Sequence, residues 1–441
     1  MTIRFSLALI VCIGGFSSVV GAQQPYNVTT TIPNLATLFT RLYGPDGLIV
    51  DSLATLPGEQ PHSAHFVSDF QSDFGQFSTA LVGQLVTVPL PSPASGFTYR
   101  FDPSLGVFER TTQSFGPVLA ERTQTVGAGR ISFGSAWQRV TFDTIEGLDL
   151  DRVPVVFTHD NAELLGGRED VVATVNSIAA TVSQFTTFLT VGVTDRFDVS
   201  IAVPIVSNRI QVVSDATIHR LGTTNPLTHF FRQSDDSIGS RRLFTVFGDA
   251  SGLGDVTVRL KGTLTELSPN VAAGLDIRLP TGDELNLLGT GAPGLQPFIV
   301  WSTAIEQVSP HVNAGYQWNG SSVLAGNPAT GEAGDFHDQV TYAMGADVRV
   351  NSRFTLALDV LGRYVRDGER LAPEEFQGLD GESTFSNVAF STGSFHVLSG
   401  SVGFKANLLA QLLLDVNVLF ALDDHGLRDQ ITPLIGVEYA F

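Results

Sequence analysis

Apolar and polar residues alternate along most of the chain from residue 170 onward, with a period of two. In "VTVRLKG", Val256, Val258 and Leu260 share one parity, whereas Arg259 and Lys261 lie on the other. Successive side chains of a β-strand point to opposite faces, so this pattern predicts strands with one apolar and one polar face. The same alternation recurs in "GLDIRL", "AMGADVRV" and "PHVNAGYQW".

Ten charged side chains in these and neighbouring segments all fall on the polar parity. They are Arg259, Lys261, Asp276, Arg278, Asp347, Arg349, Asp359, Arg363, Asp415 and Glu438. A charge that faces lipid at mid-bilayer costs about 2 to 4 kcal/mol, and a wet lumen removes most of that cost. We therefore expect the ten to line the lumen of a barrel, either as ion pairs that narrow or gate the bore or as charges that only neutralise one another.

The connections between the strand-like segments alternate between short and long. The short turns are residues 194–198, 266–270, 306–310, 350–353 and 406–409. The long polar loops are residues 214–251, 281–293, 319–337, 367–394 and 423–429. This asymmetry is typical of transmembrane barrels, which have tight periplasmic turns and long external loops. A soluble β-sandwich with one solvated face would explain the alternation equally well but not the asymmetry.

The number of strands follows from the same pattern. Eleven segments lie between residues 170 and 441, and a single-chain barrel usually has an even number of strands. Residues 128–142 supply one earlier strand, and residues 77–88 and 97–112 are candidates for two more. We expect an all-β fold, a transmembrane antiparallel barrel over residues 76–441 with 14 strands preferred over 12. Residues 171–193 are the weakest strand and exceed one membrane crossing.

The first residues predict export. Residues 1–22 have a basic start at Arg4, an apolar run and a small-residue end, which is typical of a secretory signal peptide cut after Ala22. Cleavage before Cys12, as in a lipoprotein, is a weaker alternative because Val11 is large for such a site. Cys12 is the only cysteine, so the mature chain would have no disulfide and no thiolate site.

The alternation fails before residue 76. The stretch "IPNLATLFTRLYGPDGLIVDS" predicts a short helix followed by a turn. Two interpretations of residues 23–75 stay open. One is a plug folded into the lumen, as larger barrels often have, and the other is a periplasmic lead-in.

The last strand ends on an aromatic residue. Ile435, Val437, Tyr439 and Phe441 share the outward parity. A terminal aromatic with apolar residues at every second preceding position is typical of the signal for the barrel-assembly machinery. It predicts the outer membrane as the location, outer-membrane lipid as a partner, and a last residue in the aromatic girdle at the periplasmic interface.

Composition narrows the class of protein. A net charge of -19 with only two lysines argues against a nucleic-acid partner, because phosphates repel such a chain. A mean hydropathy of +0.17 with 16% charged residues is apolar for a secreted soluble protein. The one long charge-free stretch, residues 171–193, contains Asn176 and Gln184 and makes a poor bilayer helix.

Motifs for catalysis and cofactors are weak. "GTGAPG" (289–294) matches a dinucleotide fingerprint, but Pro293 and the absence of a following helical pattern make it a loop. The nine histidines lack metal-ligand spacing, so we interpret them as solvated loop or strand-end residues. "SDDS" and "LDDHG" carry the carboxylates of a calcium site, but we interpret them as solvated loops. No serine and histidine are paired by spacing. We expect no cofactor, no metal and no enzymatic activity.

Three stretches resemble a known family. They are "GLGDVTVRLKG" (252–262), "GLDIRLPTGDELNLLGTGAPGLQPFIVWS" (274–302) and "SPHVNAGYQWNG" (309–320). Their order is similar to that in the outer-membrane channels named for the meta-pathway of phenol degradation, and residues 426–441 resemble the closing strand of that family. The resemblance covers residues 170–441. It implies an architecture similar to the long-chain fatty-acid channels, which admit hydrophobic or aromatic compounds, and it does not imply enzymatic breakdown of phenol.

The predicted function is therefore an outer-membrane channel for the passive uptake of small hydrophobic or aromatic molecules. Two alternatives stay open for a barrel of this kind. One is a barrel without transport activity whose loops serve binding or adhesion, and the other is a hydrolase at the barrel rim. A soluble periplasmic sandwich is the alternative outside the membrane.

Overall fold

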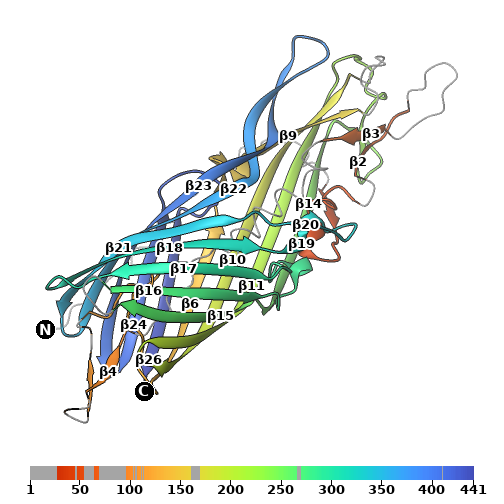
Figure 1. Ribbon diagram of the computed structural model, residues 1–441. Helices are drawn as coiled ribbons and strands as arrows, with labels where there is room; N and C mark the ends of the chain where they lie inside the picture. The colour runs from red at the N-terminus through yellow and green to blue at the C-terminus, as the bar shows by residue number, and fades with distance from the viewer. Residues whose placement is uncertain are drawn as a thin grey trace, which may run out of the picture.

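The main feature of the fold is an antiparallel sheet that closes on itself (Figure 1). The computed structural model describes residues 27–441 except 45–46, 54–63, 69–95, 103, 105–106, 111, 113, 160–168, 266–269 and 410. Strand β6 (Ile131–Phe142) pairs with β10 (Val171–Thr194) along one edge and with the last strand, β26 (Ile431–Ala440), along the other. Because the first and last wall strands pair, this sheet is a barrel.

The barrel wall has twelve strand positions among the described residues. After β6 and β10 the wall continues through β11 (Phe197–His219), β14 (Arg241–Leu253) with β15 (Val256–Thr265), β16 (Asn270–Leu279), β17 (Gly294–Ser302), β18 (Val308–Asn319), β21 (Gln339–Asn351), β22 (Phe354–Gln377), β23 (Thr384–Leu409), β24 (Leu412–Ala421) and β26. Strands β14 and β15 share one position, since they pair with successive parts of β11. The eleven strands expected after residue 170 are confirmed.

The preference for 14 strands is wrong. Strands β4 (Tyr99–Asp102) and β5 (Val107–Arg110) form a separate two-stranded sheet and are not part of the wall. Each has four residues, whereas a membrane-crossing strand needs about 9 to 11. The alternation in this hairpin was correct, but alternation does not identify the pairing partner of a strand. The other candidate, residues 77–88, lies outside the described residues.

The two ends of the barrel differ, as expected. At the end that we call the turn end, residues 195–196, 303–307 and 352–353 join consecutive strands, and the C-terminus lies there (Figure 1). At the opposite end, the loop end, four strands extend far upward: β10, β11, β22 and β23 have 24, 23, 24 and 26 residues. A strand of that length is more than twice what a membrane crossing needs.

Two of the predicted long loops are therefore largely strand. Residues 214–251 contain the end of β11 and most of β14, and residues 367–394 are mostly the upper part of the β22–β23 hairpin. These segments are polar and rich in glycine, which suggested loops. Their backbone groups instead pair across the hairpins, and pairing satisfies backbone donors and acceptors whatever the side chains are.

Smaller elements cover the loop end. They are β7 (Thr144–Ile145), β8 (Leu148–Asp149), η2 (Leu150–Arg152), β9 (Val153–His159), β12 (Phe231–Arg232), β13 (Ile238–Gly239), η4 (Glu284–Asn286), β19 (Ser321–Asn327), β20 (Glu332–Asp335) and β25 (Leu427–Arg428). None of the helices in the described part of the chain is long and apolar enough to span a membrane.

The N-terminal residues 27–50, which we call the N-terminal arm, pack in the upper half of the barrel. The arm contains β1 (Asn27–Thr30), which pairs in parallel with β14, then η1 (Leu35–Thr37) and β2 (Leu48–Val50), which pairs with β3 (Ala64–Val67). The expected short helix is thus a single 3-10 turn, capped by the side chain of Asn34.

The arm forms the largest apolar core together with inward-facing residues of β10, β11 and β14. Leu35, Leu38 and Leu42 are at most 2% exposed within this core. The Tyr43 hydroxyl lies 2.8 Å from the Ser214 hydroxyl on β11, and its ring packs edge-on against Phe157 and Phe244. The arm therefore lies against the inner face of the extended wall.

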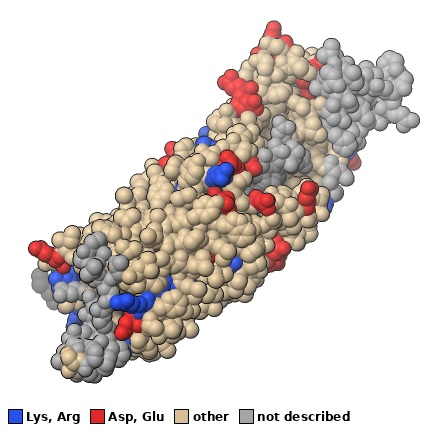
Figure 2. All heavy atoms as spheres, in the orientation of Figure 1, with Lys and Arg blue, Asp and Glu red and all other residues tan. Residues whose placement is uncertain are grey.

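The outward parity of the wall strands is apolar and exposed. On the last strand Ile435, Val437 and Tyr439 are 46%, 46% and 39% exposed, and Phe441 after it is 57% exposed. Figure 2 shows that the middle of the visible barrel face carries few charged side chains, whereas acidic residues gather toward the loop end. The apolar surface is thus a band around the barrel.

Candidate functional site

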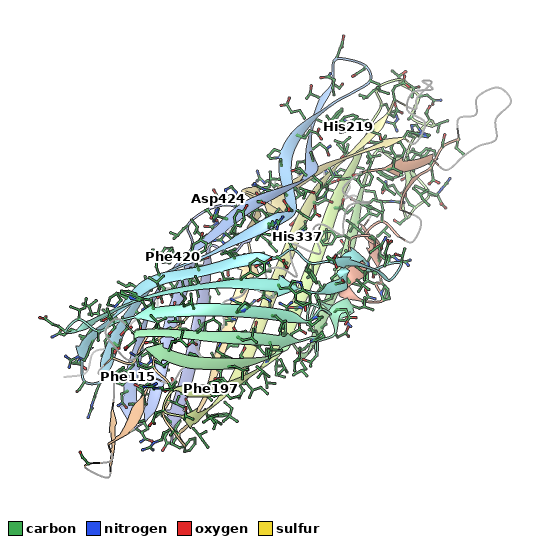
Figure 3. All side chains as sticks on the ribbon, in the orientation of Figure 1. Phe115, Phe197, His219, His337, Phe420 and Asp424 are labelled. Atoms are coloured by element: carbon green, nitrogen blue, oxygen red, sulfur yellow. The ribbon has the colours of Figure 1, made fainter. Side chains whose placement is uncertain are left out.

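One segment between the β4–β5 hairpin and β6 crosses the interior near the turn end. Residues 114–127, which we call the inner segment, are buried throughout apart from Gln124, which is half-buried. Its atoms bond to inward side chains on β11, β15, β17, β18 and β22. Strands that are so far apart around a closed wall can share one partner only if that partner lies inside. Figure 3 labels Phe115 of this segment near the turn end.

Glu121 is the ionic anchor of the inner segment. Its carboxylate accepts hydrogen bonds from Arg259 and from Lys261 Nζ, the latter at 3.0 Å. Arg259 also binds the Asp276 carboxylate in bidentate fashion, with both N···O distances at 2.6 Å. Two cations thus face two anions, so this buried cluster is neutral, and a buried charge needs such partners to be tolerated.

Lysine 261 also holds the backbone of the inner segment. Its Nζ donates to the carbonyl oxygens of Arg122 at 3.2 Å and Gln124 at 3.0 Å. The Lys261 side chain is only 3% exposed, so all of its visible partners are protein atoms. One wall lysine therefore fixes three consecutive parts of the segment.

Neutral side chains of the wall bind the rest of the segment. The Asn313 amide accepts from the Glu121 backbone N–H at 2.6 Å and donates to the Glu121 carbonyl at 3.0 Å. The Thr123 hydroxyl lies 2.7 Å from that of Ser302, and Thr263 donates to the Thr123 carbonyl at 2.6 Å. The segment lacks regular secondary structure, so these side chains replace the backbone partners that a strand would have had.

The segment leaves the lumen through a close backbone contact. A Cβ atom on Gly192, near the end of β10, would lie 1.9 Å from the Gly127 carbonyl oxygen, and Gly127 itself has a φ of +100°. Neither position tolerates a side chain, because one lacks space and the other has a left-handed backbone. Both glycines are therefore needed where the segment turns into β6.

The other predicted charges are distributed over several local groups. Arg278 donates to Asn319 at 2.8 Å and lies 3.8 Å from Asp255, and Lys405 lies 3.9 Å from Asp415. Glu438 accepts from the backbone N–H of Gly96 at 2.8 Å. The structure thus divides the ten residues into separate groups, and only Arg259, Lys261 and Asp276 share one network.

Asp347 and Asp359 flank a histidine. The His311 Nε2 atom lies 2.6 Å from Asp359 Oδ1, and its Nδ1 atom lies 3.7 Å from Asp347 Oδ1. Arg363 lines the cavity described below, and Arg349 is half-buried near the turn end of β21.

The interpretation of the histidines as solvated is wrong for three of them. His311, His229 and His159 are 1%, 2% and 4% exposed. His229 lies 2.8 Å from the buried Asp170 carboxylate, at the loop end. Each tertiary partner is more than 40 positions away in sequence, so spacing along the chain could not reveal it. Among the described residues, no three histidine, cysteine, aspartate or glutamate side chains gather as a metal site would require.

A central cavity of about 320 Å³ lies above the inner segment. Its floor includes Leu119, Ala120 and Glu121. One part of its wall is polar, with Arg259, Asp276, Arg278, Gln296, Asn313, Gln317 and Gln339 from β15–β18 and β21. The opposite part is largely apolar, with Val140, Phe142, Leu361, Val397, Leu419 and Phe420 from β6 and β22–β24. The cavity therefore has two chemically different sides.

Sequence reasoning missed the inner segment and the residues that hold it. Glu121, Ser302 and Asn313 are central to the site, yet the segment of Glu121 has no periodicity and the two neutral residues carry no charge to count. Asn313 and Ser302 do lie on the inward parity, so parity applied to neutral polar residues would have found them.

The family comparison matches part of the chain. Residues 160–360 match the model of a family described as the MetA pathway of phenol degradation. The matched segment is just under half of the 441 residues and contains the three motif stretches between residues 252 and 320. No curated protein matches the chain.

Solved structures share the overall shape at low identity. The COG4313 outer membrane channel from Pseudomonas putida F1 is 12% identical with a TM-score of 0.42, over 73% of this chain and 99% of that one. The Ralstonia pickettii toluene transporter TbuX is 12% identical with a TM-score of 0.32, over 74% and 94%. The CymD monoaromatic hydrocarbon channel is 10% identical with a TM-score of 0.33, over 71% and 89%. These likenesses are distant.

The family match and the barrel agree with what the motif order implied. The matched residues run from the start of β10 into β22, so they cover half of the wall and the ionic anchor at Arg259 and Lys261. Residues 160–360 of this chain match the phenol-degradation MetA family, and the resemblance inferred from the motifs is confirmed over that segment.

Proposed function

We propose that the protein is an outer-membrane channel for the passive uptake of small hydrophobic or aromatic molecules. The observation that carries this proposal is a closed barrel whose interior holds a cavity between two chain segments, the N-terminal arm above and the inner segment below. A closed antiparallel barrel with an apolar outer band is one of the two solutions for crossing a bilayer.

The outward apolar residues support the membrane location. Strands of the wall expose residues such as Ile299, Val402 and Val437, each between 46% and 51% exposed. A water-soluble protein rarely exposes a continuous apolar band of this size, because contiguous apolar patches favour association. In this proposal the turn end faces the periplasm and the loop end faces outward.

The interior supports a path for small solutes. A solute would enter at the loop end, occupy the central cavity and leave past the inner segment at the turn end. The inner segment is held by hydrogen bonds and ion pairs, so its displacement needs no covalent change. We propose that it is the plug of the channel and that the N-terminal arm narrows the entrance above it.

The charges on the inward parity then have a mainly structural role. Arg259, Lys261 and Asp276 hold the plug through Glu121, and the remaining pairs neutralise one another in the packed interior. The proposal assigns no catalytic residue and no cofactor. Signal peptide cleavage after Ala22 and recognition of the Phe441 pattern by the assembly machinery belong to the same proposal.

Uptake into vesicles tests the function. Purified protein in lipid vesicles should accelerate the entry of a small aromatic solute, relative to empty vesicles and relative to vesicles with an unrelated closed barrel. A sugar should enter more slowly than the aromatic solute. Entry of neither solute above the rate of empty vesicles would refute the channel and favour a barrel that only presents its loops.

A further inference from the structure

Two buried glutamine side chains line the central cavity without a hydrogen-bond partner. The Gln138 Oε1 atom on β6 and the Gln339 Oε1 atom on β21 are both buried and unpartnered among the described residues. Gln138 is 3% exposed and Gln339 is 8% exposed. Leaving a buried amide oxygen unpaired is unfavourable, and most such atoms in folded proteins are paired.

The surroundings of the two amides define what would satisfy them. Gln138 shares the inward parity of β6 with Val140 and Phe142, which also line the cavity. Phe298 on β17 and Phe420 on β24 contribute aromatic surface elsewhere on the wall. A partner for these amides must therefore combine a hydrogen-bond donor with an apolar body.

The volume limits the size of that partner. An apolar cavity of about 150 Å³ is enough for one benzene ring. A cavity of about 320 Å³ accommodates a single substituted ring but not an extended lipid chain in one compact conformation.

We propose that the central cavity is a binding site for one-ring molecules that carry a hydroxyl or amino donor, and that it selects them over hydrocarbons and ethers of the same size. The donor would bond to the amide of Gln138 or Gln339, and the ring would contact the apolar side of the cavity. A hydroxyl group suits either orientation of an amide, because it both donates and accepts. This inference rests on the proposed function for its biological meaning, but the binding itself does not depend on transport.

Binding to the full chain in lipid nanodiscs tests the selectivity. The probes are phenol and aniline, which donate, against anisole and toluene, which do not. Empty nanodiscs supply the correction for partition into lipid. A neutral hydrogen bond contributes enough for phenol and aniline to bind about 3- to 10-fold more tightly than anisole and toluene. Equal affinity for all four probes would mean that water satisfies both amides, and would overturn the inference.

Substitution assigns the selectivity to the two residues. Gln138→Met and Gln339→Met keep the side-chain length and remove the amide, so at least one of them should bring the preference for phenol over anisole close to 1. Gln430→Met is the matched control, because Gln430 is exposed outside the cavity. A preference that survives in both single variants and in the double variant would also overturn the inference. If a variant does not fold, the four-probe series on the unaltered chain still decides.

The result separates this inference from the proposed function. Vesicle uptake without any preference among the four probes would leave the channel standing and reject the donor site. Selective binding without vesicle uptake would retain the site and reject the channel.

Discussion

Glu121 has the densest set of polar contacts on the inner segment. Its carboxylate binds Arg259 and Lys261, and its backbone N–H and carbonyl both bind Asn313. The wall residues Arg259 and Lys261 could be predicted from parity, because a charge on an apolar outer face is costly. Their partner could not, since nothing near Glu121 in the sequence indicates that it crosses the lumen.

Removal of the Glu121 carboxylate should release the plug. In Glu121→Ala, Arg259 keeps Asp276, but Lys261 loses its only carboxylate among the described residues. Breaking a buried ion pair costs about 3 to 5 kcal/mol, so the displaced state of the segment should gain roughly 100-fold in population. Planar-bilayer recordings should show more frequent and longer openings.

The control for this variant is Glu332→Ala, which changes an exposed carboxylate on β20. It should leave the recordings unchanged. Identical conductance in Glu121→Ala and in the unaltered protein would mean that the inner segment does not block the path.

Tyr43 gives a test of the arm's packing. Burial raises the pKa of the Tyr43 hydroxyl to about 12, although hydrogen bonds with Ser214 and Thr174 act in the opposite direction. The ordinary pKa is about 10, so the arm's stabilisation through neutral Tyr43 is complete below that pH and is lost as the pH rises through the folded value. Packing of the arm is thus insensitive to pH in the physiological range.

The measurement is a titration of tyrosinate absorbance in the unaltered protein and in Tyr43→Phe. The difference between the two curves should be one tyrosine that ionises near pH 12. A difference that ionises near the ordinary value of about 10 would show that the Tyr43 hydroxyl is solvated and that the arm is not packed inside.

At the level of elements, alternation predicted the wall but not everything paired with it. Strands β15 and β16 follow from "VTVRLKG" and "GLDIRL" because one of their faces is apolar and the other holds buried charges. The upper halves of β22 and β23 lack that contrast, since neither face meets lipid, so they resembled loops. The same lack of contrast led to the β4–β5 hairpin being counted as wall strands.

The outward face of a wall strand should be sensitive to charge in a depth-dependent way. Ile299→Arg places a charge on β17, where Ile299 is 51% exposed in the middle of the strand. Leu409→Arg places one at the turn end of β23, where Leu409 is 72% exposed. A lipid-facing arginine costs about 2 to 4 kcal/mol at mid-bilayer and about 0 to 1 kcal/mol near the interface.

Unfolding of both variants from lipid vesicles by denaturant measures this difference. Ile299→Arg should lower the free energy of unfolding by the larger amount, and Leu409→Arg should change it little. Equal effects of the two substitutions would indicate that the apolar band does not face lipid.

At the scale of the whole molecule, the fold is a twelve-stranded barrel with its interior occupied from both ends. The arm fills the upper half through apolar contacts, and the inner segment crosses the lower half through polar ones. The fold class, the loop asymmetry and the parity of ten charges could be predicted from local pattern. The occupants of the lumen could not, because their contacts join residues more than 100 positions apart.

The central claim is that solute passes through the lumen and must displace the inner segment at the turn end. The Thr123 and Ser302 hydroxyl oxygens lie 2.7 Å apart, so cysteines at both positions can be linked across the contact that the plug makes with the wall. The background carries Cys12→Ala, which removes the only native cysteine. Ser302→Cys alone, treated with the same oxidant, is the control.

The measurement that tests this claim most directly is the uptake of an aromatic solute by vesicles that contain Thr123→Cys/Ser302→Cys. Mass spectrometry first establishes that the disulfide has formed. Uptake should fall to the rate of empty vesicles in the oxidised state and return on reduction, while the control stays active throughout. Equal uptake by the cross-linked and the reduced protein would contradict the account.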